Sequence, residues 1–105
     1  MSYKELASFL KILSDPSRLE ILNLLSCGEL CACDLLEHFH FSQPTLSHHM
    51  KVLVKNHLVI THKIGNKHMY QLNKNLFESV INNLATVHTS NQRCICHALN
   101  NGKCS

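Results

Sequence analysis

The sequence has little of what membrane, secreted and large multidomain proteins require. Its 105 residues include no tryptophan, two prolines and three glycines, and aromatic residues make up 6%. A chain of this length buries one modest core, so we expect a single folded domain. No apolar run is long enough to cross a bilayer, and the start MSYKELASFL lacks the basic residues and apolar block of a signal peptide. We therefore expect a cytoplasmic protein with no membrane partner.

Carboxylates are absent from residues 38–77. That segment holds five lysines and seven of the nine histidines, whereas residues 1–37 hold three basic and six acidic residues. The formal net charge of +3 at pH 7 therefore hides a basic middle and an acidic start. A surface free of carboxylates suits contact with a polyanion such as DNA. A solvated basic face without a partner is the alternative.

Motifs of common enzyme classes are also missing. No Cys-x-x-Cys lies on a strand–helix–strand pattern, and there is no glycine-rich phosphate loop. The histidines cluster with lysines rather than with acids, so no nucleophile pairs with a base. We expect that the chain is not an enzyme and needs no obligatory cofactor.

Apolar periodicity predicts five helices and one hairpin. The helices are expected up to Leu13, from Pro16 to Gly28, from 30 to 39, from Ser42 to 55 and from 74 to 88. Residues 58–64 and 68–72 alternate as strands around the turn Gly65-Asn66. This order predicts a mainly α winged helix-turn-helix with a β-hairpin wing. The expected core includes Leu19, Leu22, Leu25, Leu35, Leu36, Phe39, Leu46, Met50 and Leu53.

The helix that begins at Ser42 is the expected recognition helix, which enters the major groove. Its amide and hydroxyl side chains suit base edges, and its lysines suit phosphates. The candidate DNA-binding residues, two of which bracket the hairpin turn, are Gln43, Thr45, Ser47, His48, His49, Lys51, Lys55, Lys63 and Lys67. Such residues are also common on surfaces without a ligand, and His49 beside the apolar stripe equally suits a packing role.

Cys31 and Cys33 lie one residue apart at the start of the third predicted helix. Thiolates bind thiophilic ions such as trivalent arsenic or antimony, zinc, cadmium or Cu(I), and a helix N-terminus favours the thiolate form. Residues two apart on a regular helix point to nearly opposite sides, so we expect both sulfurs to bind one ion only if the helix start is distorted.

The candidates for a third ligand are Cys27, Cys94 and Cys96, with Cys104 and His97 as weaker ones. Cys27 has an alternative role as a small buried apolar residue at a helix end. The cysteines after residue 90 have an alternative reading as incidental thiols.

Residues 3–88 resemble the arsenic-repressor (ArsR/SmtB) family of bacterial metal-sensing repressors. The matching pieces are LSDPSRLEILNLL, ELCACDLLEHF, SQPTLSHHMKVL and LVITHKIGNKHMYQL. The piece ELCACDL is similar to the metal-binding box of arsenite and antimonite sensors and of their cadmium- and lead-sensing relatives. The resemblance implies a homodimer that binds an inverted-repeat operator of an arsenic-resistance operon. It also implies release of that operator when As(III) or Sb(III) binds Cys31 and Cys33.

The chain departs from each branch of that family. One arsenite-sensing branch has a third cysteine where this chain has Leu36, and the cadmium and lead branch uses an N-terminal extension, whereas no cysteine here precedes Cys27. The zinc branch uses ligands on the last helix, where this chain offers only His88. A cadmium, lead or zinc sensor with four thiolates therefore stays an alternative, as does a thiol redox switch.

We assign residues 1–90 to a DNA-binding and dimerisation domain and residues 91–105 to a cysteine-containing C-terminal tail. The first and last helices carry more apolar surface than a monomer needs, which predicts a homodimer. The residues concerned are Leu6, Phe9, Leu13, Leu76, Val80, Leu84 and Val87. For induction we expect a regular third helix in the DNA-bound state, whose first turn unwinds or shifts when one ion draws both sulfurs together.

Overall fold

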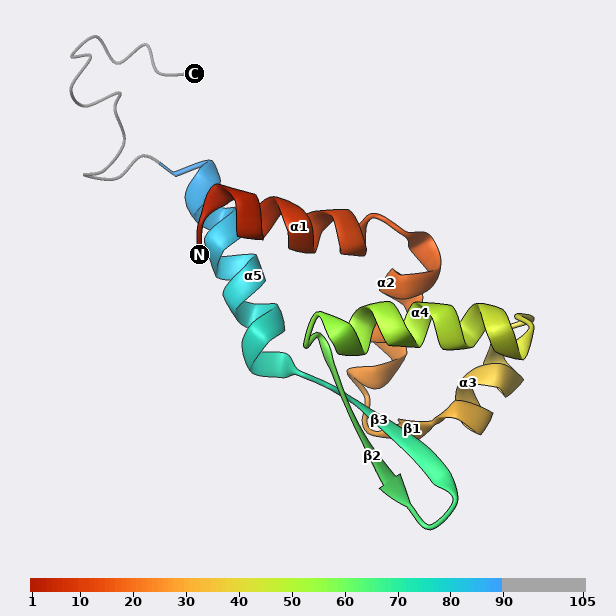
Figure 1. Cartoon of the computed structure of the whole chain (residues 1–105). Coiled ribbons are helices and arrows are strands. Elements are labelled where there is room, and N and C mark those ends of the chain that lie inside the picture. Colours follow the sequence, from red (N-terminus) through yellow and green to blue (C-terminus); the bar gives the residue numbers. More distant parts are fainter. Residues whose placement is uncertain (90–105) are drawn as a thin grey trace, which may run out of the picture.

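Five helices and three short strands make up residues 1–89, the part of the chain that the structure, a computed structural model, describes. Their order along the chain is shown by colour in Figure 1. The elements are α1 (Tyr3–Leu13), α2 (Pro16–Leu25), β1 (Leu30–Cys31), α3 (Ala32–His38), α4 (Gln43–Lys55), β2 (Val59–Ile64), β3 (Lys67–Leu72) and α5 (Lys74–Val87). The predictions for Cys94, Cys96, His97 and Cys104 lie outside the described residues.

Short polar side chains begin the helices as predicted. The Asp15 carboxylate accepts a hydrogen bond of 3.1 Å from the Arg18 backbone N–H, with Pro16 in the first turn of α2. That hydrogen bond lowers the pKa of Asp15. Ser42 accepts in the same way from the Thr45 N–H at 3.3 Å and begins α4. These caps satisfy N–H groups that have no partner within their helices.

Apolar side chains of α2, α3 and α4 and the start of β2 form one core. Ile21, Leu35 and Leu53 are fully buried at its centre. The prediction that Leu19 belongs to this core is wrong, because Leu19 is 48% exposed. The buried stripe of α2 runs through Ile21, Leu22 and Leu25, and Leu19 lies beside it. Leu36 is half-buried rather than buried.

The sheet has three antiparallel strands in the order β1–β3–β2, one more than the sequence predicted. The hairpin of β2 and β3, which we call the wing, pairs from Val59 opposite Leu72 to Ile64 opposite Lys67. Its turn uses Gly65 at a φ of +61°. The assignment of residues 30 and 31 to the third helix is wrong, because they pair with β3 through Leu30–Tyr70 and Cys31–Met69.

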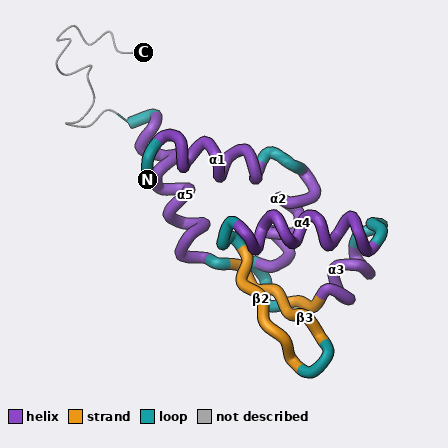
Figure 2. The backbone as a smooth tube through the Cα atoms, in the orientation of Figure 1, coloured by secondary structure: helices purple, strands orange, loops and turns teal. Residues whose placement is uncertain are grey.

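The arrangement of the elements is that of a winged helix-turn-helix, as predicted. The turn at residues 39–42 joins α3 to α4, and the wing extends away from the helices (Figure 2). At the other end α1 and α5 lie side by side (Figure 1). Within residues 1–89 no helix combines the length and the apolar character needed to cross a membrane.

Candidate metal site and nucleic-acid interface

Cys31 and Cys33, which we call the sulfur pair, lie where β1 meets α3. Cys31 is the N-cap residue of α3 and has extended backbone, with φ −85° and ψ 164°. The Cα atoms of the two residues are 5.3 Å apart, and their sulfurs are joined as a disulfide. The prediction that the two side chains diverge on a regular helix is wrong, because Cys31 is a strand residue. The two sulfurs therefore meet without any unwinding of α3.

Asp34 holds Cys31 in this position through a capping box. The Asp34 backbone N–H donates to the Cys31 sulfur at 3.2 Å, and the Cys31 N–H donates to the Asp34 carboxylate at 3.0 Å. One ligand atom from each of Cys31, Cys33 and Asp34 lies within 4.8 Å of the others. Asp34 was not among the residues predicted for the site, although its position three residues after Cys31 is the spacing of a capping box.

The sulfur pair has one buried and one exposed member. Cys31 is 4% exposed, whereas Cys33 and Asp34 are exposed. When the disulfide is reduced, this cluster offers one buried and one exposed sulfur donor, both soft, and one exposed carboxylate. That donor set fits a thiophilic ion better than a hard one.

Cys27 lies apart from this cluster. It is an exposed free cysteine, so its reading as a buried apolar residue is wrong. Cys27 lines a cavity of about 330 Å³ together with Glu29, Lys74 and Asn75. Within residues 1–89 no third thiol joins the sulfur pair. A third sulfur ligand from Cys27, Cys94 or Cys96 stays a prediction.

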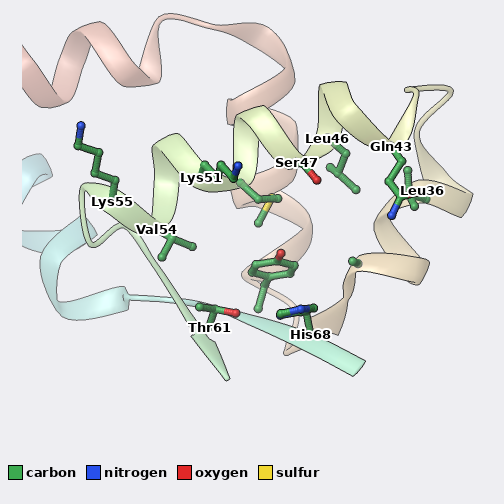
Figure 3. Close-up of a pocket in the computed structure, with 12 residues that line it drawn as sticks. Leu36, Gln43, Leu46, Ser47, Lys51, Val54, Lys55, Thr61 and His68 are labelled. Carbon is green, nitrogen blue, oxygen red and sulfur yellow. The ribbon is translucent and has the colours of Figure 1, made fainter. Parts of the chain in front are cut away.

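A groove of about 710 Å³ separates α4 from the wing (Figure 3). Gln43, Ser47, Lys51 and Lys55 line it from α4, where their spacing of four residues places them on one face. Thr61 and His68 face them from the wing. The groove thus has amide and hydroxyl groups toward the start of α4 and lysines toward its end, a pattern suited to bases and phosphates respectively.

Three wing residues of this groove, Thr61, His68 and Tyr70, were missed by the sequence analysis. Residues two apart on one strand share a face of the sheet, so the pairing of the strands places these three side chains on one face. That this face lines a groove depends on its packing against α4. Burial raises the pKa of the Tyr70 hydroxyl, which therefore stays neutral and can both donate and accept hydrogen bonds.

The remaining candidate DNA-binding residues lie outside the groove. Thr45 and His48 are exposed on α4, and Lys63 and Lys67 are exposed on the two sides of the wing turn. His49 is half-buried, and its Nδ1 accepts a hydrogen bond of 3.4 Å from Arg18 of α2. The structure thus gives His49 a packing contact between α2 and α4, and its role in DNA binding stays a prediction.

A helix-turn-helix followed by a β-hairpin wing is the architecture of winged helix-turn-helix DNA-binding domains. The sequence pattern of bacterial regulatory proteins of the arsR family matches residues 15–61. The chain belongs to the arsR family, which confirms the resemblance seen in the sequence. Its relatives are named as regulators, in agreement with the prediction that the chain is not an enzyme.

Two relatives match along almost the whole chain. The chain is 69% identical to the arsenical resistance operon repressor of Staphylococcus aureus and 67% identical to that of Staphylococcus xylosus. Each match covers 99% of this chain and 100% of the relative. Among solved structures, the ArsR family transcriptional regulator RHA00566 has a TM-score of 0.73 at 27% identity, over 82% of this chain and 89% of that chain.

Proposed function

We propose that the protein is a cytoplasmic, homodimeric transcriptional repressor of an arsenic-resistance operon. It binds operator DNA and releases it when As(III) or Sb(III) binds Cys31 and Cys33. The observation that carries the proposal is the meeting of two sulfurs at the junction of β1 and α3, where β1 pairs with β3 of the wing and α3 leads into α4. The names of the two staphylococcal relatives support the operon and the class of inducer.

The sulfur pair can influence both the wing and α4 because Cys31 contacts the wing directly and reaches α4 through α3. Its backbone pairs with Met69 in the wing sheet, and its side chain caps α3, which is joined to α4 by residues 39–42. A trivalent metalloid is a soft acceptor for two thiolates. A change in the position of Cys31 therefore reaches α4 and the wing together. The inducer lowers the affinity for the operator to the extent that it binds the arrangement that does not bind DNA more tightly than the arrangement that does.

The proposed dimer surface is formed by exposed apolar side chains of α1 and α5. Tyr3 is 87% exposed, and Ile81, Leu84 and Val87 are 50%, 44% and 60% exposed. These three α5 residues follow each other at intervals of three, so they form one stripe. Leu6 and Val80, which we also expected at the interface, are buried within the protomer. A twofold dimer presents two α4 helices to half-sites about one helical turn, or a multiple, apart.

The roles of base-reading and phosphate-binding residues should be separable. We expect Gln43→Ala or Ser47→Ala to cost on the order of 1–3 kcal/mol on the cognate operator and to relax its specificity. Lys63→Ala or Lys67→Ala should weaken binding to all DNA alike and reduce the salt dependence. Fluorescence anisotropy with operator and random DNA at several salt concentrations measures both effects, with Lys4→Ala on α1 as control. Equal losses for Gln43→Ala and Lys63→Ala on both DNAs would contradict this division.

A second candidate function, a thiol redox switch, is favoured by the disulfide between Cys31 and Cys33. Hydrogen peroxide would take two electrons and two protons from the two thiols, forming the sulfur–sulfur bond and two molecules of water. The oxidised pair has no thiolate to offer an ion. Oxidation and metalloid binding are therefore mutually exclusive at this site.

One gel-shift experiment on the DNA upstream of the protein's own operon separates these functions. The reduced protein, kept in a phosphine reductant, should bind this DNA and release it with As(III) or Sb(III), but not with Zn(II). The peroxide-treated protein should stay insensitive to As(III) until it is reduced. Release by peroxide alone would favour the redox switch, and release by Cd(II) but not As(III) would favour the cadmium sensor.

A further inference from the structure

We propose that Glu29 and His62 are positioning residues that connect the sulfur pair to the wing, so that the state of Cys31 controls the wing as well as α4. The inference rests on the proposed function and adds a second route of regulation to the same site. It is carried by the register of the sheet and by one ion pair across it.

The register of the three strands places the relevant side chains in one row. Met69 is paired with Cys31 on one side and with His62 on the other. Residues opposite each other in an antiparallel sheet share a face, and so do residues two apart on one strand. Cys31, Met69 and His62 therefore share the face that is turned away from the groove, because Thr61, His68 and Tyr70 line the groove.

Glu29, which lies beside the sulfur pair in the sequence, contacts His62 of this row. It precedes Cys31 by two residues, and its carboxylate oxygen lies 2.7 Å from Nε2 of His62. Without this contact, β1 is held to the sheet by only two residue pairs, Leu30–Tyr70 and Cys31–Met69. The Glu29–His62 pair adds a link from the chain beside Cys31 directly to β2, the outer strand of the wing.

The Glu29–His62 pair is better suited to transmitting a movement of β1 to the wing than to stabilising the fold. The His62 and Glu29 side chains are 44% and 34% exposed, and an ion pair this exposed contributes little to the free energy of unfolding. With the link present, a displacement of β1 at Cys31 moves β2 and β3 together with it. Without the link, β1 can shift against β3 while the wing, with Lys63 next to His62, keeps its position on the DNA.

The test compares the coupling of the wild type with that of its variants, in the full-length reduced protein at one pH and one salt concentration. Coupling is the ratio of the operator dissociation constant with As(III) to that without As(III). His62→Ala and Glu29→Gln should each lower this ratio by about 3- to 10-fold. His62→Lys, which places a hydrogen-bond donor opposite Glu29, should restore most of it. The As(III) affinity of the DNA-free variants should stay close to that of the wild type, because no ligand has changed.

The chain supplies a matched control in His38, which forms the other described histidine–carboxylate pair, with Glu20 at 3.4 Å between α3 and α2. His38→Ala should leave the coupling ratio unchanged. A second readout needs no metalloid: amide hydrogen exchange at residues 30–31 should be faster in His62→Ala than in the wild type and unchanged in His38→Ala.

Two outcomes would overturn the inference. One is an unchanged coupling ratio in both His62→Ala and Glu29→Gln, and the other is an equal loss of coupling in His38→Ala. In either case As(III) would still release the wild-type protein from its operator, so the proposed function would stand. Failure of the wild type itself to respond to As(III) would instead reject the proposed function.

Discussion

Replacing both Cys31 and Cys33 by serine should abolish release of the operator by As(III) while DNA affinity stays within about twofold of the wild type. Serine removes both soft sulfur donors, and a hydroxyl is a poor ligand for a thiophilic ion. Serine is also a favoured N-cap residue, so the variant can keep the capping box with Asp34 at the start of α3. The variant thus separates metalloid binding from the architecture that positions α4.

The measurement is operator release in a titration with As(III), with the bound arsenic counted in parallel. Cys27→Ser is the matched control, because Cys27 is exposed and lies outside the cluster of Cys31, Cys33 and Asp34. The Cys27→Ser variant should still release the operator with As(III), with a smaller loss of response than the double serine variant. Deletion of residues 91–105 should at most weaken the affinity for the ligand. Normal release by the double serine variant would move the sensing site elsewhere, with the cysteines after residue 90 as the first candidates.

An aspartate in place of Leu84 should convert the protein to a monomer and lower its affinity for the full operator by about a hundredfold or more. The charge would be buried against apolar side chains of the partner, at a cost that an apolar interface cannot offset. A monomer binds one half-site at a time and loses the gain from binding two half-sites at once. Its affinity for a single half-site should change little.

Analytical ultracentrifugation at micromolar concentration and binding to full and half operators test this prediction. Leu19→Asp is the matched control, because Leu19 is an apolar α2 residue with 48% exposure, close to the 44% of Leu84, and lies outside the proposed dimer surface. Circular dichroism checks that both variants keep their helices. A Leu84→Asp protein that remains dimeric and binds the operator normally would show that the dimer forms through another surface.

The mechanism of induction changes once β1 is recognised. The sequence predicted that the first turn of α3 unwinds or shifts when one ion draws the two sulfurs together. The structure removes that requirement, because the extended backbone of Cys31 already places its sulfur beside that of Cys33. On the proposed mechanism, the strain of binding an ion would fall on β1 and on the capping box with Asp34, and the wing would become part of the response.

The sequence by itself determined the helices, the hairpin and the location of the sulfur pair. Ser42 and Pro44 mark the start of α4, and the last helix was expected at 74–88 and is found at Lys74–Val87. These features are readable because caps, turns and apolar periodicity are local properties of the chain. The motif that carries the family resemblance, ELCACDL, is likewise a continuous stretch.

Only the tertiary structure decided β1, the groove and the Glu29–His62 contact. A two-residue strand has no periodicity of its own, and Leu30 and Cys31 become extended because β3, about forty residues later, offers a free edge to pair with. The exposure of Leu19 and Cys27 depends equally on which neighbours pack beside them. Periodicity shows which face of an element is apolar, but the partner that covers this face comes from distant parts of the chain.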